Sequence, residues 1–172
     1  MNQEAYLKIG RRQQSVIFKV SGRGTIRNSP PLENLALAAL KEGEAKEIII
    51  DLEDCLYMDS TFMGTLVGIN AALLKKGNRK LIIVNANDRN KHLLSNLGLS
   101  RIMELRNKVG KFETEWELIV NAPLKSRVLA KHILAAHNSL EKIDAQSKAR
   151  FSEVKRLLLE SLSQEKPSAS KG

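Results

Sequence analysis

The chain has 172 residues, about the length of one domain, and 42% of them are hydrophobic and 27% charged. Its apolar runs span only a few residues, which excludes a transmembrane helix of about 20 residues. The single cysteine, Cys55, excludes an internal disulfide and a multi-cysteine metal site. The N-terminus lacks a basic segment followed by an apolar one, so we expect no signal peptide and a cytoplasmic protein.

The formal net charge of +9 is spread unevenly along the chain. Residues 1–122 carry 18 basic and 14 acidic side chains, whereas residues 123–172 carry 10 and 5. A basic excess attracts nucleic acid, anionic lipid or an acidic protein and does not choose among them. Aromatic residues make up only 4%, which is too few for a stacking platform, so direct nucleic-acid binding is not expected.

The first part of the sequence predicts a hairpin followed by a helix. Residues 6–9 and 15–20 have the composition of strands, and the polar residues 10–14 between them suit a loop. The run Asn28-Ser29-Pro30 combines a capping residue with a proline at the first helical position, which predicts a helix start. We expect Gly43 to end that helix.

A second strand and helix follow. The β-branched run at residues 46–52 predicts a strand that is buried on both faces, and residues 53–58 predict a short loop. Asp59 then stands where a helix N-cap belongs, and Gly77-Asn78 ends the helix. Apolar positions spaced by three and four define the buried face of this helix: Phe62, Met63, Leu66, Ile69 or Asn70, and Leu73.

A third strand and helix follow, and then a short final strand. Residues 80–84 predict a buried strand, Asn87 caps a helix that runs to about Leu97, and residues 102–105 predict a short final strand. The order β-β-α-β-α-β-α-β predicts an α/β fold in which helices pack on a mixed sheet.

The C-terminal third predicts a linker and a helical extension. Residues 109–122 lack clear periodicity, and Trp116 either anchors this segment on the main domain or forms an exposed partner contact. Residues 123–163 carry one apolar stripe at helical spacing. They form either one long helix or a hairpin, because Asn138 and Glu141 have capping-box spacing. The polar residues 164–172 are expected to be disordered.

The junction at Asp59 is the most informative site for function. Ser60 would be the first helical residue, with its hydroxyl group at the positive end of the helix. A phosphate on that hydroxyl would meet helix amides and also the like charge of Asp59, and would add about −2 charge to the surface. Such an arrangement suits a switch that blocks docking without unfolding. The alternative is that Asp59-Ser60-Thr61 is only a capping sequence.

The junction and its flanking elements resemble the STAS domain, the fold of bacterial anti-sigma factor antagonists. The resemblance covers roughly residues 4–106. It rests on the order of elements, the strand Ile48-Ile49-Ile50-Asp51-Leu52, the turn Met58-Asp59-Ser60-Thr61, and Leu81-Ile82-Ile83-Val84-Asn85 with the later Leu97-Gly98-Leu99. It implies a STAS-type mixed sheet with helices packed on it over residues 1–108, followed by the C-terminal helical extension.

The resemblance also implies a function in signal transduction and transcription regulation. In this family a partner kinase, which is also the anti-sigma factor, phosphorylates the serine after the aspartate, and a serine phosphatase reverses the modification. Carried over, Ser60 is the phosphorylated residue, and Thr61 is an adjacent hydroxyl that some members also modify. The partner surface would comprise Asp59, Ser60, Thr61, Phe62 and Met63. The unphosphorylated form would bind the anti-sigma factor serine kinase and so release a sigma factor.

Two features depart from the family pattern. Many members have glycine directly after the two hydroxyl residues, whereas this chain has Phe62 and Met63 before Gly64, and a bulky side chain there would reshape the docking surface. A minimal antagonist also lacks the basic C-terminal extension. The alternative function is therefore a STAS scaffold or an accessory subunit of a stress-signalling or transporter complex, which self-associates or docks through that extension.

Other site types are poorly supported by the sequence. The carboxylates of Asp51, Asp54 and Asp59 could suggest Mg²⁺ chemistry, but they fall at a strand end, in a loop and at a cap, so no metal or other cofactor is expected. The five-residue gap between His132 and His137 predicts different helix faces, so each is interpreted as an ordinary surface or interface histidine. Because the chain offers no nucleophile–base pair, we expect a binding protein and not an enzyme.

Overall fold

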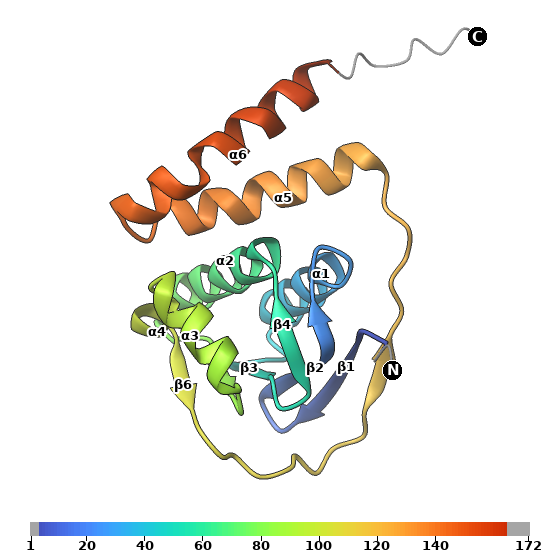
Figure 1. Cartoon of the computed structure of the whole chain (residues 1–172). Helices are drawn as coiled ribbons and strands as arrows, with labels where there is room; N and C mark the ends of the chain where they lie inside the picture. The colour runs from blue at the N-terminus through green and yellow to red at the C-terminus, as the bar shows by residue number, and fades with distance from the viewer. Residues whose placement is uncertain (1–3, 165–172) are drawn as a thin grey trace, which may run out of the picture.

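A computed structural model describes residues 4–164 (Figure 1). The strands are β1 (Tyr6–Arg12), β2 (Ser15–Gly24), β3 (Glu47–Asp51), β4 (Cys55–Met58), β5 (Ile82–Val84), β6 (Glu104–Arg106) and β7 (Glu117–Ile119). The helices are α1 (Ser29–Lys41), α2 (Ser60–Gly77), α3 (Asp88–Asn96), α4 (Leu99–Ile102), α5 (Ser126–Glu141) and α6 (Ala145–Gln164).

The sheet is mixed, as the sequence predicts. Its main path runs β6-β5-β3-β2-β1-β7, and β4 pairs with β2 outside this path. The outer pairs β1–β2 and β1–β7 are antiparallel, whereas β2–β3, β3–β5 and β5–β6 are parallel. The parallel pairs arise because a helical segment returns the chain to the same edge of the sheet between successive strands.

The β3 strand is buried on both faces, which explains its uninterrupted apolar sequence. Ile48 and Ile50 point into the main core, which lies between the sheet and the helices. Ile49 points the other way, into a smaller cluster with Ile17, Ile82 and Val84. Trp116 packs against this second cluster together with Val109 and Phe112, so it anchors the segment after β6 on the domain.

Three short elements differ from the sequence prediction. Residues 53–58 were expected to form a loop, but Cys55–Met58 is the strand β4, which pairs in parallel with the end of β2. The expected strand at residues 102–105 begins later, at Glu104, because residues 99–102 form the single turn α4. The expected linker contains β7, which pairs with β1.

The C-terminal extension is a helical hairpin, the second of the two arrangements left open by the sequence. The break falls at residues 142–144 and not at Asn138, where the capping-box spacing was expected to place it. Asp144 caps α6 by accepting a hydrogen bond from the Ser147 amide at 2.8 Å. Of the residues expected to form a disordered tail, Gln164 is the last residue of α6, and residues 165–172 lie outside the described residues.

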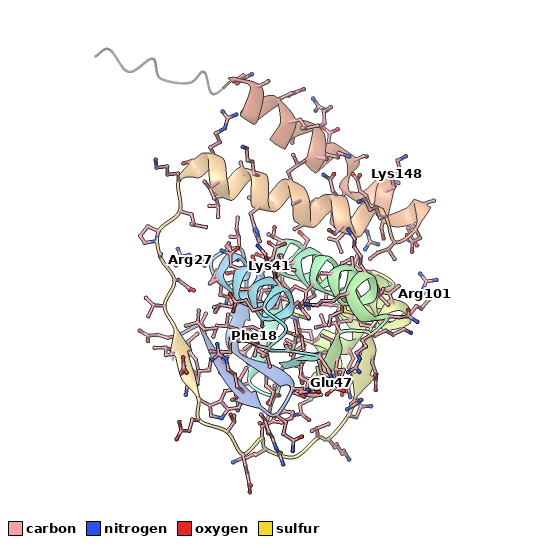
Figure 2. The ribbon with its side chains drawn as sticks, turned by 180° about the vertical axis from the view of Figure 1, so that it is seen from behind. Phe18, Arg27, Lys41, Glu47, Arg101 and Lys148 are labelled. Atoms are coloured by element: carbon pink, nitrogen blue, oxygen red, sulfur yellow. The ribbon has the colours of Figure 1, made fainter. Side chains whose placement is uncertain are left out.

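The hairpin packs on the side of the helices away from the sheet (Figures 1 and 2). Helix α5 contacts α2, and α6 packs on α5. The apolar side chains of Leu140 and Phe151 extend the main core into this third layer. Within residues 4–164, no helix is both long enough and apolar enough to cross a membrane.

Candidate partner-binding site

Asp59 organises the junction between β4 and α2. Its side chain caps the helix by accepting from the Phe62 amide at 2.7 Å, as the sequence predicts, and its second oxygen accepts from the Ile26 amide at 3.1 Å. The Asp59 amide in turn donates to Gly24 O at 2.9 Å. The carboxylate therefore fixes the start of α2 and also ties it to the loop between β2 and α1.

Ser60 is the first residue of α2 and is partly exposed. The first amides of a helix lack intrahelical acceptors, and the helix dipole places partial positive charge near this hydroxyl. A phosphate on Ser60 would gain from both features, but the Asp59 carboxylate one residue away would repel it. The local geometry therefore has the opposing electrostatic effects that the sequence predicts.

The residues that follow Ser60 turn mostly inwards. Thr61 is buried at 6% exposure, and Met63 at 4%. The ring of Phe62 is fully buried in the main core, where it packs beneath Gly24 so closely that a Cβ there would lie 2.9 Å from ring carbons. The bulky residue that departs from the family pattern is therefore a core residue, and its side chain does not protrude from the first turn of α2.

Helix α5 brings His137 onto Ser60. A hydrogen bond joins His137 Nε2 and Ser60 Oγ at 3.1 Å across 77 residues of sequence. The imidazole is 4% exposed and packs against the Phe151 ring, with 5.2 Å between the ring centroids. This burial lowers the pKa of His137, while the negative charges of Asp59 and Glu141 act in the opposite direction.

His132 makes a second polar contact between α5 and the domain. Its Nε2 lies 2.9 Å from Ser29 Oγ at the start of α1 and 3.2 Å from Thr65 Oγ1 on α2. Its Nδ1 lies 3.1 Å from a carboxylate oxygen of Glu33. The interpretation of both residues as surface or interface histidines agrees with these contacts, because each ring finds a hydroxyl partner on the domain.

The sequence held one signal for this contact. Gly64 and Gly68 stand four residues apart in α2, and glycines at helical spacing permit another backbone to approach closely. A Cβ built at Gly64 would lie only 2.2 Å from Ala136 O, so α5 and α2 touch there at the backbone. The periodicity of the extension predicted its helices, but it could not show which surface they cover.

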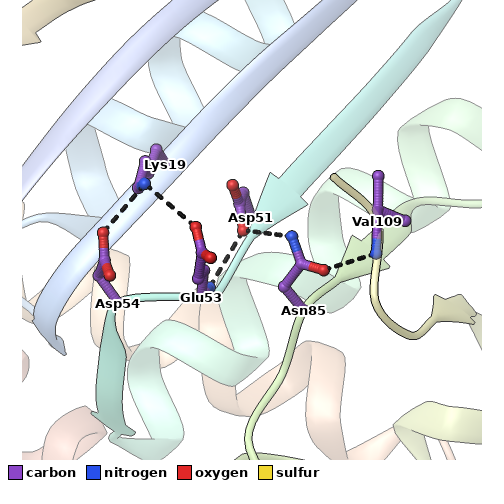
Figure 3. A network of polar contacts seen from close by, with 6 residues as sticks. All are labelled: Lys19, Asp51, Glu53, Asp54, Asn85 and Val109. Atoms are coloured by element: carbon purple, nitrogen blue, oxygen red, sulfur yellow. Dashed lines mark hydrogen bonds and ion pairs between the residues drawn. The ribbon is translucent and has the colours of Figure 1, made fainter. Parts of the chain in front are cut away.

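The carboxylates that could suggest a magnesium site have separate partners (Figure 3). Asp51 is buried at 2% exposure and accepts from the Glu53 amide at 3.0 Å and from Asn85 Nδ2 at 3.1 Å. Asp54 pairs with Lys19 Nζ at 3.0 Å. These bonds hold the carboxyl end of β3 against its neighbours. In residues 4–164, no group of three or more His, Cys, Asp or Glu side chains is placed to hold a metal ion.

Cys55 is fully buried behind the same loop. Burial raises the pKa of its thiol, so the thiolate that would act as a nucleophile is disfavoured. Its carbonyl oxygen accepts from Asn87 Nδ2 at 2.9 Å and from Asn90 Nδ2 at 2.8 Å, which fixes α3 to β4. The residue is therefore structural.

Comparison with known proteins identifies the family to which the domain belongs. The STAS domain family matches residues 6–112. An anti-sigma-B factor antagonist of Staphylococcus aureus (strain NCTC 8325) is 32% identical over 87 residues, which is 51% of this chain and 79% of that protein. The match thus covers most of the relative but only half of this chain.

Solved structures share the fold at lower sequence identity. The anti-sigma factor antagonist SpoIIAA in its unphosphorylated form aligns with a TM-score of 0.51 at 16% identity, covering 60% of this chain and 89% of that one. The Bacillus cell fate determinant SpoIIAA in its phosphorylated form aligns with a TM-score of 0.50 at 18% identity, covering 59% and 92%. The family match, the curated relative and the observed mixed α/β architecture together place this chain in the STAS domain, anti-sigma factor antagonist family.

Proposed function

We propose that this chain is a phosphorylation-switched anti-sigma factor antagonist. In its unphosphorylated form it binds an anti-sigma factor serine kinase through the surface around Ser60, and phosphate on Ser60 opposes that binding. A serine phosphatase restores the binding form. The protein acts by binding and not by catalysis, and the kinase supplies the phosphoryl group.

One observation carries this proposal more than any other. The Ser60 hydroxyl stands at the first position of an 18-residue helix whose cap is fixed by Asp59 from two directions. A phosphate there would change the surface charge by about −2, while the cap and the buried residues beneath it hold the backbone in place. The modification would therefore alter docking without a need to unfold the domain.

The buried positions of the neighbouring residues refine the proposed partner surface. Asp59 and Ser60 are partly exposed and would meet the partner, whereas Phe62 and Met63 would support the turn from beneath. Thr61 is a poorer phosphate acceptor than Ser60, because its side chain is buried. The scaffold alternative, in which the extension self-associates, has less support. Three residues of its apolar stripe are already buried within the same chain: Ala136, Leu140 and Phe151.

The proposal is tested by binding of an anti-sigma factor serine kinase from the cells that make this protein. We expect Ser60→Asp to weaken binding at least tenfold, since a carboxylate places negative charge at the docking surface. Ser60→Ala should bind at least as tightly as the unmodified chain but accept no phosphate in the presence of ATP, and Thr61→Ala should still be phosphorylated. Equal dissociation constants for Ser60→Asp and the unmodified chain, measured by calorimetry, would contradict the switch.

A further inference from the structure

The hairpin α5–α6 covers the surface that the proposed function requires. Helix α5 lies along α2 on its face away from the sheet (Figure 1), and His137 bonds the hydroxyl that a kinase would have to reach. A kinase must bring that oxygen into line with the phosphate of its nucleotide, at a few ångströms. The side of Ser60 that faces α5 is closed to such an approach.

The contact leaves no room for a partner between the two helices. Gly64 lies one turn after Ser60. A Cβ there would lie 2.2 Å from Ala136 O, so the backbones of α2 and α5 are in contact at this point. A specific protein partner typically buries about 800 Å² on each side. With α5 seated along α2, the face that begins at Ser60 cannot supply such an area, so α5 and a partner are alternative occupants of it.

Within residues 4–164, helix α5 carries buried polar atoms without partners, as the domain does at Ser21 Oγ and Asn90 Oδ1. Three buried polar atoms on α5 have no hydrogen-bond partner among the described residues: His137 Nδ1, Asn138 Oδ1 and Glu141 Oε1. Of these, only His137 is shown at the contact with α2, through its bond to Ser60, and its unpaired nitrogen would regain hydration when α5 leaves. The apolar contacts of Leu140 and Phe151 favour docking, and the unpaired Nδ1 of His137 opposes it.

The connection to the domain allows α5 to leave while the sheet stays intact. Strand β7 is held by its pairing with β1, at Leu7 with Ile119 and Lys8 with Leu118. Residues 120–125 then form neither helix nor strand, and residues 120–128 are exposed. Release of the hairpin therefore needs backbone rotation only in a solvent-exposed segment.

From these contacts we infer that α5–α6 is an autoinhibitory cover, which must leave α2 before Ser60 can meet its kinase. The inference rests on the proposed function, because it assigns a regulator to the same site. The covered form is the resting state, and whatever displaces the hairpin raises both binding and phosphorylation at Ser60. The extension is then the element that distinguishes this chain from an antagonist whose serine is always accessible.

The cover is tested on the full chain with a thiol reporter in place of the serine. Ser60→Cys adds one thiol to a chain whose other cysteine, Cys55, is fully buried and reports global unfolding. We expect slow modification of Ser60→Cys by Ellman's reagent. Adding Gly64→Ala should raise the rate at least tenfold, because the new methyl group would collide with the Ala136 carbonyl, while alanine favours the helix itself.

Gly68→Ala is the matched control. It lies one turn further along α2, where a Cβ would be 3.7 Å from Ser139 Oγ, an ordinary contact distance. We expect its labelling rate to stay within about twofold of Ser60→Cys alone. Leu140→Asp tests the same point from the hairpin side, since it removes an apolar anchor that α5 contributes to the main core, and it should raise the rate as Gly64→Ala does while Cys55 stays unreactive.

Two results would contradict the inference that α5–α6 covers Ser60. One is a Ser60→Cys thiol that reacts as fast alone as with Gly64→Ala while Cys55 stays unreactive. The other is protection that falls on dilution, because the hairpin would then come from a second copy. The assay needs neither kinase nor phosphate. A chain that never carries phosphate in cells would thus contradict the proposed function, while the thiol rates would still decide whether α5 covers position 60.

Discussion

At the scale of single residues, Asp59 does more than cap a helix. Its two carboxylate oxygens accept from the amides of Phe62 and Ile26, which belong to α2 and to the loop before α1. The same charge lies next to the hydroxyl that we propose is phosphorylated. One side chain therefore sets the shape of the site in the unmodified protein and also contributes repulsion once phosphate is present.

Replacing Asp59 by alanine should destabilise the domain by about 1–2 kcal/mol, the usual range for loss of an N-cap. Asp59→Asn keeps an acceptor for the Phe62 amide and should cost less. The free energy of unfolding from urea titrations of the two variants measures this difference. If Asp59→Ala unfolded at the same urea midpoint as the unmodified chain, the structural role given to this carboxylate would be incorrect.

At the scale of elements, the docking of α5 on α2 should depend on pH through His137. Burial lowers the pKa of this imidazole in the docked form, whereas an exposed histidine titrates at about 6.5. The released form therefore binds more protons at acid pH, and docking should weaken as the pH falls through about 6.5 and below. Near pH 7.5 the imidazole is mostly neutral in both forms, so its titration should hardly affect docking there.

The charged groups near His137 lie at the start of α2, on α5 and on α6. Asp59 at the start of α2 and Glu141 on α5 favour its protonated form, and Glu141 is itself paired with Lys155 of α6 at 3.2 Å. The measurement is the ratio of labelling rates between Ser60→Cys and Ser60→Cys with Gly64→Ala at each pH, which cancels the titration of the thiol. Introducing His137→Gln should remove the dependence below pH 6.5, and its persistence would assign the effect to another group.

Elements fixed by local sequence were predicted well, and those fixed by distant partners were not. The cap at Asp59, the ends of α2 and the apolar strand β3 follow from neighbouring residues, and all three are observed. Strand β4 was expected to be a loop, because its four residues become a strand only through pairing with β2, some 30 residues earlier. Strand β7 was missed for the same reason, since its partner is β1.

The candidate site shows the same division. Asp59 and Ser60 were recognisable from the strand–turn–helix pattern, and the family resemblance gave them a role. The burial of Phe62 was predicted by its place in the apolar stripe of α2, but its position beneath Gly24 was not. His137 could not be placed on Ser60, because no local pattern relates residues 77 positions apart.

At the scale of the whole molecule, the chain is a STAS domain with its own helical hairpin laid over the site. The sheet and its helices provide a rigid support, with apolar clusters on both faces of the sheet. The hairpin is joined to this support by an exposed segment and by an interface at which His137 Nδ1 is unpaired in the described part of the chain. An unpaired buried polar group costs about 1–3 kcal/mol, which favours opening of this interface.

The central claim is that Ser60 carries the switch, and mass spectrometry of the protein purified from its native cells tests it most directly. Intact mass gives the number of phosphates, and fragment spectra separate Ser60 from Thr61. We predict a fraction of molecules with one phosphate on Ser60, which changes with growth or stress conditions and disappears in Ser60→Ala. A chain without phosphate at Ser60 under every condition, or with phosphate only elsewhere, would contradict it.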